Sequence, residues 1–127
     1  DGFDHTKYRE EVEQRWGEQA YAESDRWWRG LGEEGKQAFM AEAAAISAAW
    51  QDLRAEGVAV DDDRAARLAA RHVRWIQQGW GGRQPSSEAI EGLAQMYVAD
   101  ERFAANYGGL AGATYVRDAL LIHARSM

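Results

Sequence analysis

The sequence predicts an all-α fold of about seven helices, and three observations support this prediction. Long stretches are rich in Ala, Glu, Arg and Gln, which are good helix formers. Thirteen Gly and one Pro punctuate these stretches, and runs of alternating β-branched residues are absent. A length of 127 residues suits a single domain with one hydrophobic core.

The first two helices lie in the most polar part of the chain. The first is expected to begin after Asp4 or Thr6 and to end at Gly17, because Asp and Thr cap helix starts and Gly ends helices. The second is expected over residues 19–29, before Gly30. Residues four or seven apart share a helix face, which aligns Tyr8, Val12 and Trp16 in the first helix and Tyr21 and Trp28 in the second.

The third and fourth helices carry the clearest apolar repeats. Spacings of three and four residues place on one face of the third helix Phe39, Ala43, Ile46, Trp50 and Leu53. Gly57 is expected to end this helix, and Asp61 to Asp63 supply a cap for the next one. The fourth helix is expected to end at Gly79 and to direct inward Leu68, His72, Trp75 and Ile76.

The last three helices follow a loop over residues 80–87, which holds the single proline. Ser86 or Ser87 is expected to cap a fifth helix whose inner positions are Ile90, Leu93 and Tyr97. Asp100 is expected to cap a short sixth helix that bears Phe103 and Tyr107. Two adjacent glycines interrupt the chain there, and a seventh helix runs to about Ala124 with Tyr115, Ala119 and Ile122 aligned.

Residues 1–36 differ in composition from the rest of the chain. They contain 16 charged residues and ten apolar ones, six of which are aromatic. Little apolar surface is therefore available to offset the entropy of ordering this stretch. We predict a mobile N-terminal lid over residues 1–36 and a helical ligand-binding core over residues 37–127, within one domain overall. The alternative is that the first two helices pack permanently on the third.

The composition excludes several classes of protein. A net charge of −6 disfavours direct binding to DNA or RNA, which needs cations to replace phosphate counterions. No apolar run approaches the roughly 20 residues that span a bilayer, and the charged N-terminus does not resemble a signal peptide. The absence of cysteine excludes disulfides and thiolate chemistry and agrees with a cytoplasmic protein. Because the chain begins with Asp1 instead of Met, we expect it to be part of a longer protein.

No set of residues indicates an enzyme, a metal site or a cofactor. The three histidines are too scattered in the sequence to form a metal-binding pair. For His72, a hydrogen-bonded core residue is the favoured interpretation and haem ligation is the minor alternative. Asp100 and Glu101 are adjacent and point apart on a helix, so helix capping explains Asp100 better than acid–base catalysis does. We expect no catalytic residue.

The aromatic content is the feature that points to a function. Six Trp, five Tyr and three Phe exceed what we expect the core to need, although core packing explains each ring taken singly. That explanation is weakest for Trp16, Trp27 and Trp28, on polar segments, and for Trp80, in a loop. Aromatic walls favour flat, electron-rich ligands in largely apolar pockets. The sequence therefore predicts a cleft for an aromatic small molecule.

A family resemblance supports this prediction. Residues 92–103, GLAQMYVADERF, followed by Tyr107, strongly resemble the LAEMYVADERF segment of the TipAS domain, the thiopeptide-antibiotic-binding module of MerR-like transcriptional regulators. Weaker matches fall in the same order along nearly the whole chain, at YREEV (8–12), RWG (15–17), RHVRWI (71–76) and YVRDAL (115–120).

The resemblance implies a globin-like helical fold that binds cyclic, azole-rich thiopeptides in an aromatic cleft under a flexible N-terminal lid. It also implies a DNA-binding domain outside this chain, or a short form that acts as an antibiotic sequestrant. One departure is definite, since founding members capture the antibiotic through a cysteine at the position of Gly92. Binding by this chain should therefore be reversible. The loop over residues 80–85 is also slightly longer than that of the family, which affects the shape of the cleft.

We predict that the domain recognises thiopeptide-like antibiotics noncovalently. The predicted ligand-binding residues are Trp16, Trp28, Trp75, Leu93, Tyr97, Phe103, Tyr107 and Tyr115. The alternative is a helical protein-interaction or dimerisation module, in which the tryptophans of the lid form an adhesive surface. An enzyme or a haem protein would rest on fold analogy alone.

Overall fold

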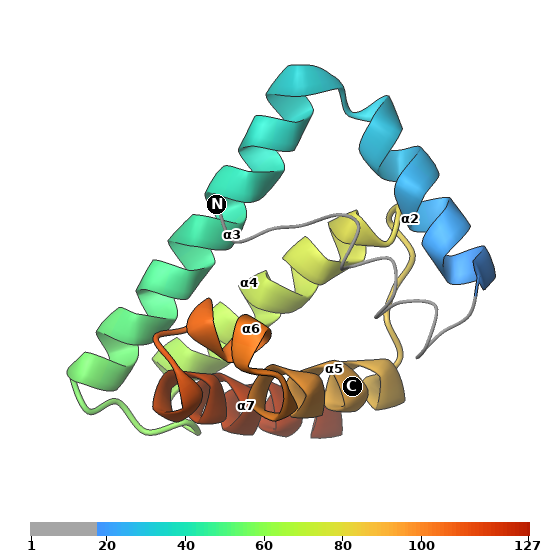
Figure 1. Cartoon of the computed structure of the whole chain (residues 1–127). Coiled ribbons are helices and arrows are strands. Elements are labelled where there is room, and N and C mark those ends of the chain that lie inside the picture. The colour runs from blue at the N-terminus through green and yellow to red at the C-terminus, as the bar shows by residue number, and fades with distance from the viewer. Residues whose placement is uncertain (1–17) are drawn as a thin grey trace.

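The computed structural model describes residues 18–127, and within this range the chain is all-helical (Figure 1). The predicted first helix, with Trp16, lies outside the described residues. The six helices that follow correspond in order to the six remaining predicted helices. No helix in residues 18–127 combines the length and the apolar character that crossing a membrane requires.

Helices α2 (Glu18–Gly30) and α3 (Gly32–Ala55) meet at a sharp corner and diverge from it (Figure 1). Leu31 separates them, and Gly32 has a φ of 73°, a conformation that glycine adopts without strain. Helix α3 begins well before its first apolar repeat position, Phe39. It therefore runs without a break through residues 36 and 37, where the composition of the chain changes.

Side-chain caps start the next three helices at the predicted places. The Asp62 carboxylate accepts the Arg64 backbone N–H at 2.8 Å and begins α4 (Asp63–Gly79). The Ser86 hydroxyl accepts the Ala89 N–H and begins α5 (Ser87–Ala99). Asp100 does the same for the short α6 (Glu101–Ala105). Each cap satisfies a donor that the helix leaves unpaired, so local sequence fixes these boundaries.

The last helix, α7 (Leu110–Arg125), follows a turn that only glycines permit. Gly108 and Gly109 have φ values of 88° and 100°. A Cβ on Gly112 would lie 1.7 Å from the carbonyl oxygen of Tyr107, so the first turn of α7 rests directly on the preceding backbone. This contact fixes Tyr107, which lies just beyond the end of α6.

The hydrophobic core lies where α5 packs along α7, with α4 and the second half of α3 closing it (Figure 1). Its largest fully buried side chains include Ile46, Trp50, His72, Ile90, Met96, Val116 and Leu120. Helix α2 lies away from this core and packs mainly against α3 and α4. The contacts between α2 and α3 include edge-to-face packing of Trp27 and Trp28 on Phe39.

Candidate ligand-binding site

An aromatic cluster joins α2, α3 and α4, and consists of Trp27, Trp28, Phe39 and Trp75. The Phe39 and Trp75 rings are stacked, with centroids 4.7 Å apart and an interplanar angle of 18°. Trp75 Nε1–H also donates to the Phe39 carbonyl oxygen at 3.1 Å, which satisfies the polar end of the indole. Gly79 makes room for the phenyl ring, because a Cβ there would come within 3.3 Å of Phe39 Cζ.

The two tryptophans of α2 cover the exposed edge of this stack. Trp27 meets Phe39 edge-to-face at 4.9 Å and 73°, and Trp28 meets it at 6.0 Å and 72°. The Lys36 ammonium lies 5.4 Å from the Trp28 ring, within the range of a cation–π contact. Trp27, Trp28 and Trp75 each remain partly exposed. The cluster therefore attaches α2 to the core and leaves apolar ring surface at the solvent boundary.

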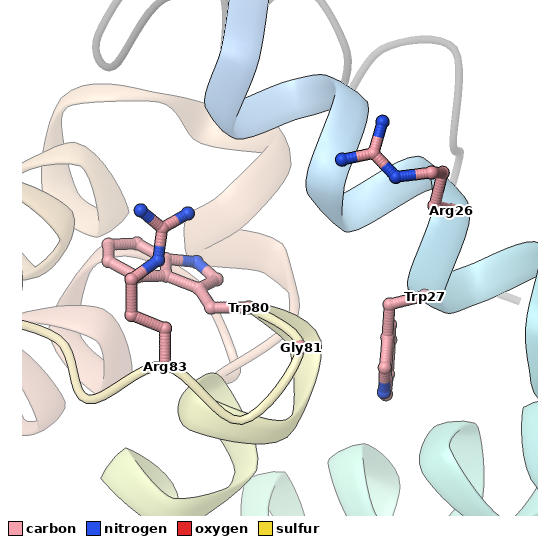
Figure 2. A pocket seen from close by; sticks show the side chains of 5 residues that line it. All are labelled: Arg26, Trp27, Trp80, Gly81 and Arg83. Atoms are coloured by element: carbon pink, nitrogen blue, oxygen red, sulfur yellow. The ribbon is translucent and has the colours of Figure 1, made fainter.

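An open hollow of about 540 Å³ borders this cluster. We call it the Trp–Arg hollow; the described residues that line it are Arg26, Trp27, Trp80, Gly81 and Arg83. Figure 2 shows Trp27 of α2 and Trp80 of the α4–α5 loop on different sides of the hollow, with Gly81 between them. Its volume lies within the range of roughly 300 to 1,000 Å³ for small-molecule sites.

A chain of hydrogen bonds crosses the core beneath the cluster. Trp50 Nε1–H donates to His72 Nδ1 at 2.9 Å, which places the proton of the neutral imidazole on Nε2. His72 Nε2 lies 3.1 Å from the Tyr97 hydroxyl, and Tyr97 is in turn hydrogen-bonded to Tyr107. Burial lowers the pKa of His72 to about 3 and raises the pKa of Tyr107 to about 12. We call Trp50, His72, Tyr97 and Tyr107 the buried relay.

The favoured interpretation of His72 as a hydrogen-bonded core residue is confirmed. The residue is 1% exposed, and both ring nitrogens are engaged, so neither is available to a haem iron. Residues 18–127 also hold no group of three His, Cys, Asp or Glu side chains placed to bind a metal ion.

The predicted ligand-binding residues fall into two groups in the structure. Trp28 and Trp75 belong to the aromatic cluster. Packed in or against the core are Leu93, Tyr97, Phe103, Tyr107 and Tyr115. Leu93, Tyr97 and Tyr107 are 7%, 3% and 8% exposed, so a ligand reaches them only if the packing around them changes. Trp16 lies outside the described residues.

The two half-buried members of the second group are held by specific contacts. Phe103 stacks on Tyr97 with centroids 6.1 Å apart. Tyr115 meets Trp50 edge-to-face at 6.0 Å, and its hydroxyl donates to the Val58 carbonyl oxygen at 2.7 Å. Both rings therefore have structural partners within the domain.

The prediction of site residues omitted Phe39 and the lining of the Trp–Arg hollow. The sequence could have indicated Trp27 and Trp80 as site residues, since neither lies on the apolar face of a predicted core helix. Phe39 was assigned to the core because it fits the apolar repeat of α3. Nothing in the sequence singled out Arg26 and Arg83 as site residues, because the negative net charge of the chain gave no reason to expect a role for arginines.

Comparison with known proteins identifies the family. The family model of the TipAS antibiotic-recognition domain matches residues 8–123. The chain belongs to this family. The fold of this TipAS-family domain is similar to that of TipAS from Streptomyces lividans, solved in complex with the thiopeptide nosiheptide. The two share 31% sequence identity and superpose with a TM-score of 0.80, over 98% of this chain and 87% of that chain.

Two curated relatives are transcriptional regulators. Both are the HTH-type transcriptional regulator SkgA of Caulobacter vibrioides, from strains NA1000/CB15N and ATCC 19089/CIP 103742/CB 15. Each is 33% identical to this TipAS-family domain over 89 residues, which are 68% of this chain and 34% of the regulator. The chain thus corresponds to about a third of the length of the curated relatives that it matches.

Proposed function

We propose that this TipAS-family domain binds thiopeptide-like macrocyclic antibiotics reversibly and carries out no reaction on them. The aromatic cluster is the observation that carries the proposal, because it presents partly exposed indole rings from two helices beside an open hollow. The overall fold supports it, since a relative of the same fold and 31% identity was solved with nosiheptide.

Binding is noncovalent in this proposal because the chain contains no cysteine. Gly92, at the position where founding family members carry the capturing thiol, offers only hydrogen in that place. Affinity must then come from buried ring surface and hydrogen bonds. An indole that loses about 150 to 250 Å² of accessible area contributes gross stabilisation of roughly 4 to 6 kcal/mol, from which ordering costs are subtracted.

The proposed contact residues remain Trp16, Trp28, Trp75, Leu93, Tyr97, Phe103, Tyr107 and Tyr115, now joined by Trp27, Phe39 and Trp80. Trp28 and Trp75 are partly exposed and are expected to meet the ligand first. The residues of the buried relay would take part only after the helices around them shift. Residues 1–36 act as the lid and residues 37–127 as the core in this proposal.

The proposed biological role of the domain rests on its relatives, which are longer proteins. We propose that the domain is the effector-binding part of a cytoplasmic transcriptional regulator, with the DNA-binding domain outside this chain, as the SkgA regulators suggest. A short form that sequesters the drug is the second possibility within the same binding function. Both need the same ligand site.

The binding proposal is tested by titrating the domain with nosiheptide and thiostrepton. Tryptophan fluorescence should fall and the melting temperature should rise at micromolar concentrations, because ligand bound to the folded state stabilises it. Trp28→Ala should weaken binding at least about tenfold, corresponding to roughly 1.4 kcal/mol. The control is Leu110→Ala, which alters a side chain that is 63% exposed and outside the cluster. A wild-type domain that responds to neither compound would refute the ligand class.

A further inference from the structure

Phe39 is the central ring of the aromatic cluster, because it contacts each of the other three members. It stacks on Trp75 at 4.7 Å, and Trp27 and Trp28 meet it edge-to-face at 4.9 Å and 6.0 Å. Phe39 is 7% exposed, whereas the three indoles around it remain partly exposed. The phenyl ring therefore fills a space bounded by indoles near the solvent boundary. We call this space the Phe39 slot.

The indole that forms the floor of the Phe39 slot is also held by contacts that do not involve the phenyl ring. Trp75 Nε1–H donates to the backbone carbonyl oxygen of Phe39 at 3.1 Å, and this bond needs only the main chain of residue 39. The Trp75 ring also meets His72 edge-to-face, with centroids 6.0 Å apart. Rotation or removal of the phenyl ring would therefore leave the indole in place as a stacking surface.

An ion pair fixes the crossing of α3 and α4 about one helical turn from the stack. Arg71 Nε–H and Nη2–H donate to the two carboxylate oxygens of Glu42 at 2.8 Å and 2.7 Å, which is a bidentate arrangement. Glu42 follows Phe39 by three residues on α3, and Arg71 precedes Trp75 by four residues on α4. The helices are thus tied beside the stacked rings. We expect a ligand to enter the slot by rotation of the Phe39 side chain and not by separation of the helices.

The end of α4 limits the size of the slot. A Cβ on Gly79 would lie 3.3 Å from Phe39 Cζ and 3.7 Å from Phe39 Cε1. The tip of the phenyl ring therefore already reaches the place where a side chain on Gly79 would begin, and a fused ring system has little room in this direction. The slot fits a single, unfused aromatic ring.

We infer that Phe39 is a specificity-determining residue, whose ring competes with a single aromatic ring of the ligand for the stacking surface of Trp75. The two rings exclude each other because both need the space between Trp75 and the tryptophans of α2. The inference rests on the proposed function. It adds that Phe39 contacts the ligand as a competitor and not as a fixed wall.

This competition lowers the apparent affinity for the ligand. When a binding-competent state is only partly populated, the apparent affinity falls in proportion to the populated fraction. To leave the slot, Phe39 gives up one stacked and two edge-to-face contacts, which stabilise aromatic pairs beyond the burial of their area. We therefore expect removal of the phenyl ring to tighten the binding of a ligand that carries such a ring by about tenfold.

Two alcohols of similar size test whether the slot accepts a free aromatic ring in Phe39→Ala. Benzyl alcohol carries a planar ring, whereas cyclohexylmethanol carries a saturated one. At millimolar concentrations, benzyl alcohol should raise the melting temperature of Phe39→Ala relative to cyclohexylmethanol, and the wild type should not distinguish the two. The matched control is Ile46→Ala, which removes a buried side chain from the same face of α3 outside the aromatic cluster. This control should show no preference for the planar ring.

Titration of the same variants with nosiheptide tests the competition itself. Phe39→Ala should bind nosiheptide about tenfold more tightly than the wild type, although the lost ring lowers its melting temperature. A ring that served only as packing would give weaker binding when it is removed. If Phe39→Ala does not fold, Phe39→Leu provides both comparisons, because leucine keeps apolar volume in the slot and cannot stack on Trp75.

Two results would overturn the inference: equal stabilisation of Phe39→Ala by the two alcohols, or nosiheptide binding that Phe39→Ala weakens or leaves unchanged. In the second case the proposed function stands and only the role of Phe39 is removed. A preference for benzyl alcohol with no nosiheptide binding by any variant would do the reverse. It would refute the ligand class and keep Phe39 as the residue that controls the access of an aromatic ring to Trp75.

Discussion

Acidification is expected to destabilise the domain through His72. The side chain is 1% exposed, accepts a hydrogen bond from Trp50 at Nδ1 and faces the Tyr97 hydroxyl at Nε2. A proton added to the folded state would have to occupy Nδ1 and break the bond from Trp50. Burial accordingly lowers the pKa of His72 from 6.5 to about 3.

The sign and size of the effect follow from proton linkage. The unfolded chain binds a proton at His72 below about pH 6.5, whereas the folded chain does so only near pH 3. Stability is therefore highest above the unfolded pKa and falls as the pH drops through the window between these values. From about pH 7 to about pH 5 the free energy of unfolding should decrease by about 2 kcal/mol on account of His72.

Urea unfolding at several pH values, followed by circular dichroism, measures this slope. His72→Gln provides a side chain that has one acceptor group and one donor group and does not titrate. Between about pH 7 and about pH 5, the free energy of unfolding of this variant should therefore decrease by about 2 kcal/mol less than that of the wild type. The pKa of His123 is also lowered by burial, and His123→Gln measures its separate contribution. A His72→Gln variant with the acid slope of the wild type would show that His72 is protonated in the folded state and refute the reasoning.

Three further predictions concern substitutions of glycines in helices. Gly112→Ala should destabilise the domain by at least about 3 kcal/mol, because the new Cβ would overlap the Tyr107 carbonyl oxygen. Gly92→Ala should stabilise the domain by about 0.5 to 1 kcal/mol, because no atom lies within 4 Å of the new Cβ and alanine favours a helix over glycine. Thermal unfolding checks both values, and equal melting temperatures for the two variants would contradict the packing at Gly112. Gly92→Cys should form a covalent adduct with a dehydroalanine-bearing thiopeptide, as in the founding members that it resembles, and intact-mass measurement should show the adduct in this variant but not in the wild type. A Gly92→Cys variant that binds the antibiotic and forms no adduct would place Gly92 away from the ligand.

The helix boundaries could be predicted because their signals are local. Asp62, Ser86 and Asp100 each accept a backbone N–H two or three residues ahead, so a short window of sequence contains both partners. The apolar repeats of α3 and α4 are similarly complete within one helix. The early start of α3 was not predicted, since residues 32–38 contain no apolar repeat and Gly32 resembles a helix terminator.

The site was harder to predict because its rings come together only through the arrangement of the helices. Trp75 was correctly placed on the inner face of α4, but its stacking partner Phe39 depends on how α3 crosses α4. That crossing brings Phe39 against Gly79, which the sequence presents only as a helix end. Trp27 and Trp80 meet at the Trp–Arg hollow for the same reason, through the position of α2 over the end of α4.

Trp75 links the two groups of aromatic residues that the structure separates. Its ring stacks on Phe39 in the aromatic cluster and also meets His72 edge-to-face, with ring centroids 6.0 Å apart and an interplanar angle of 81°. A ligand that displaces Phe39 from this stack would also change the packing on His72, and through it the hydrogen bond to Tyr97. Tyr97 belongs to the segment that most resembles the family, so occupation of the surface cluster and rearrangement of the buried relay are expected to be coupled through one indole ring.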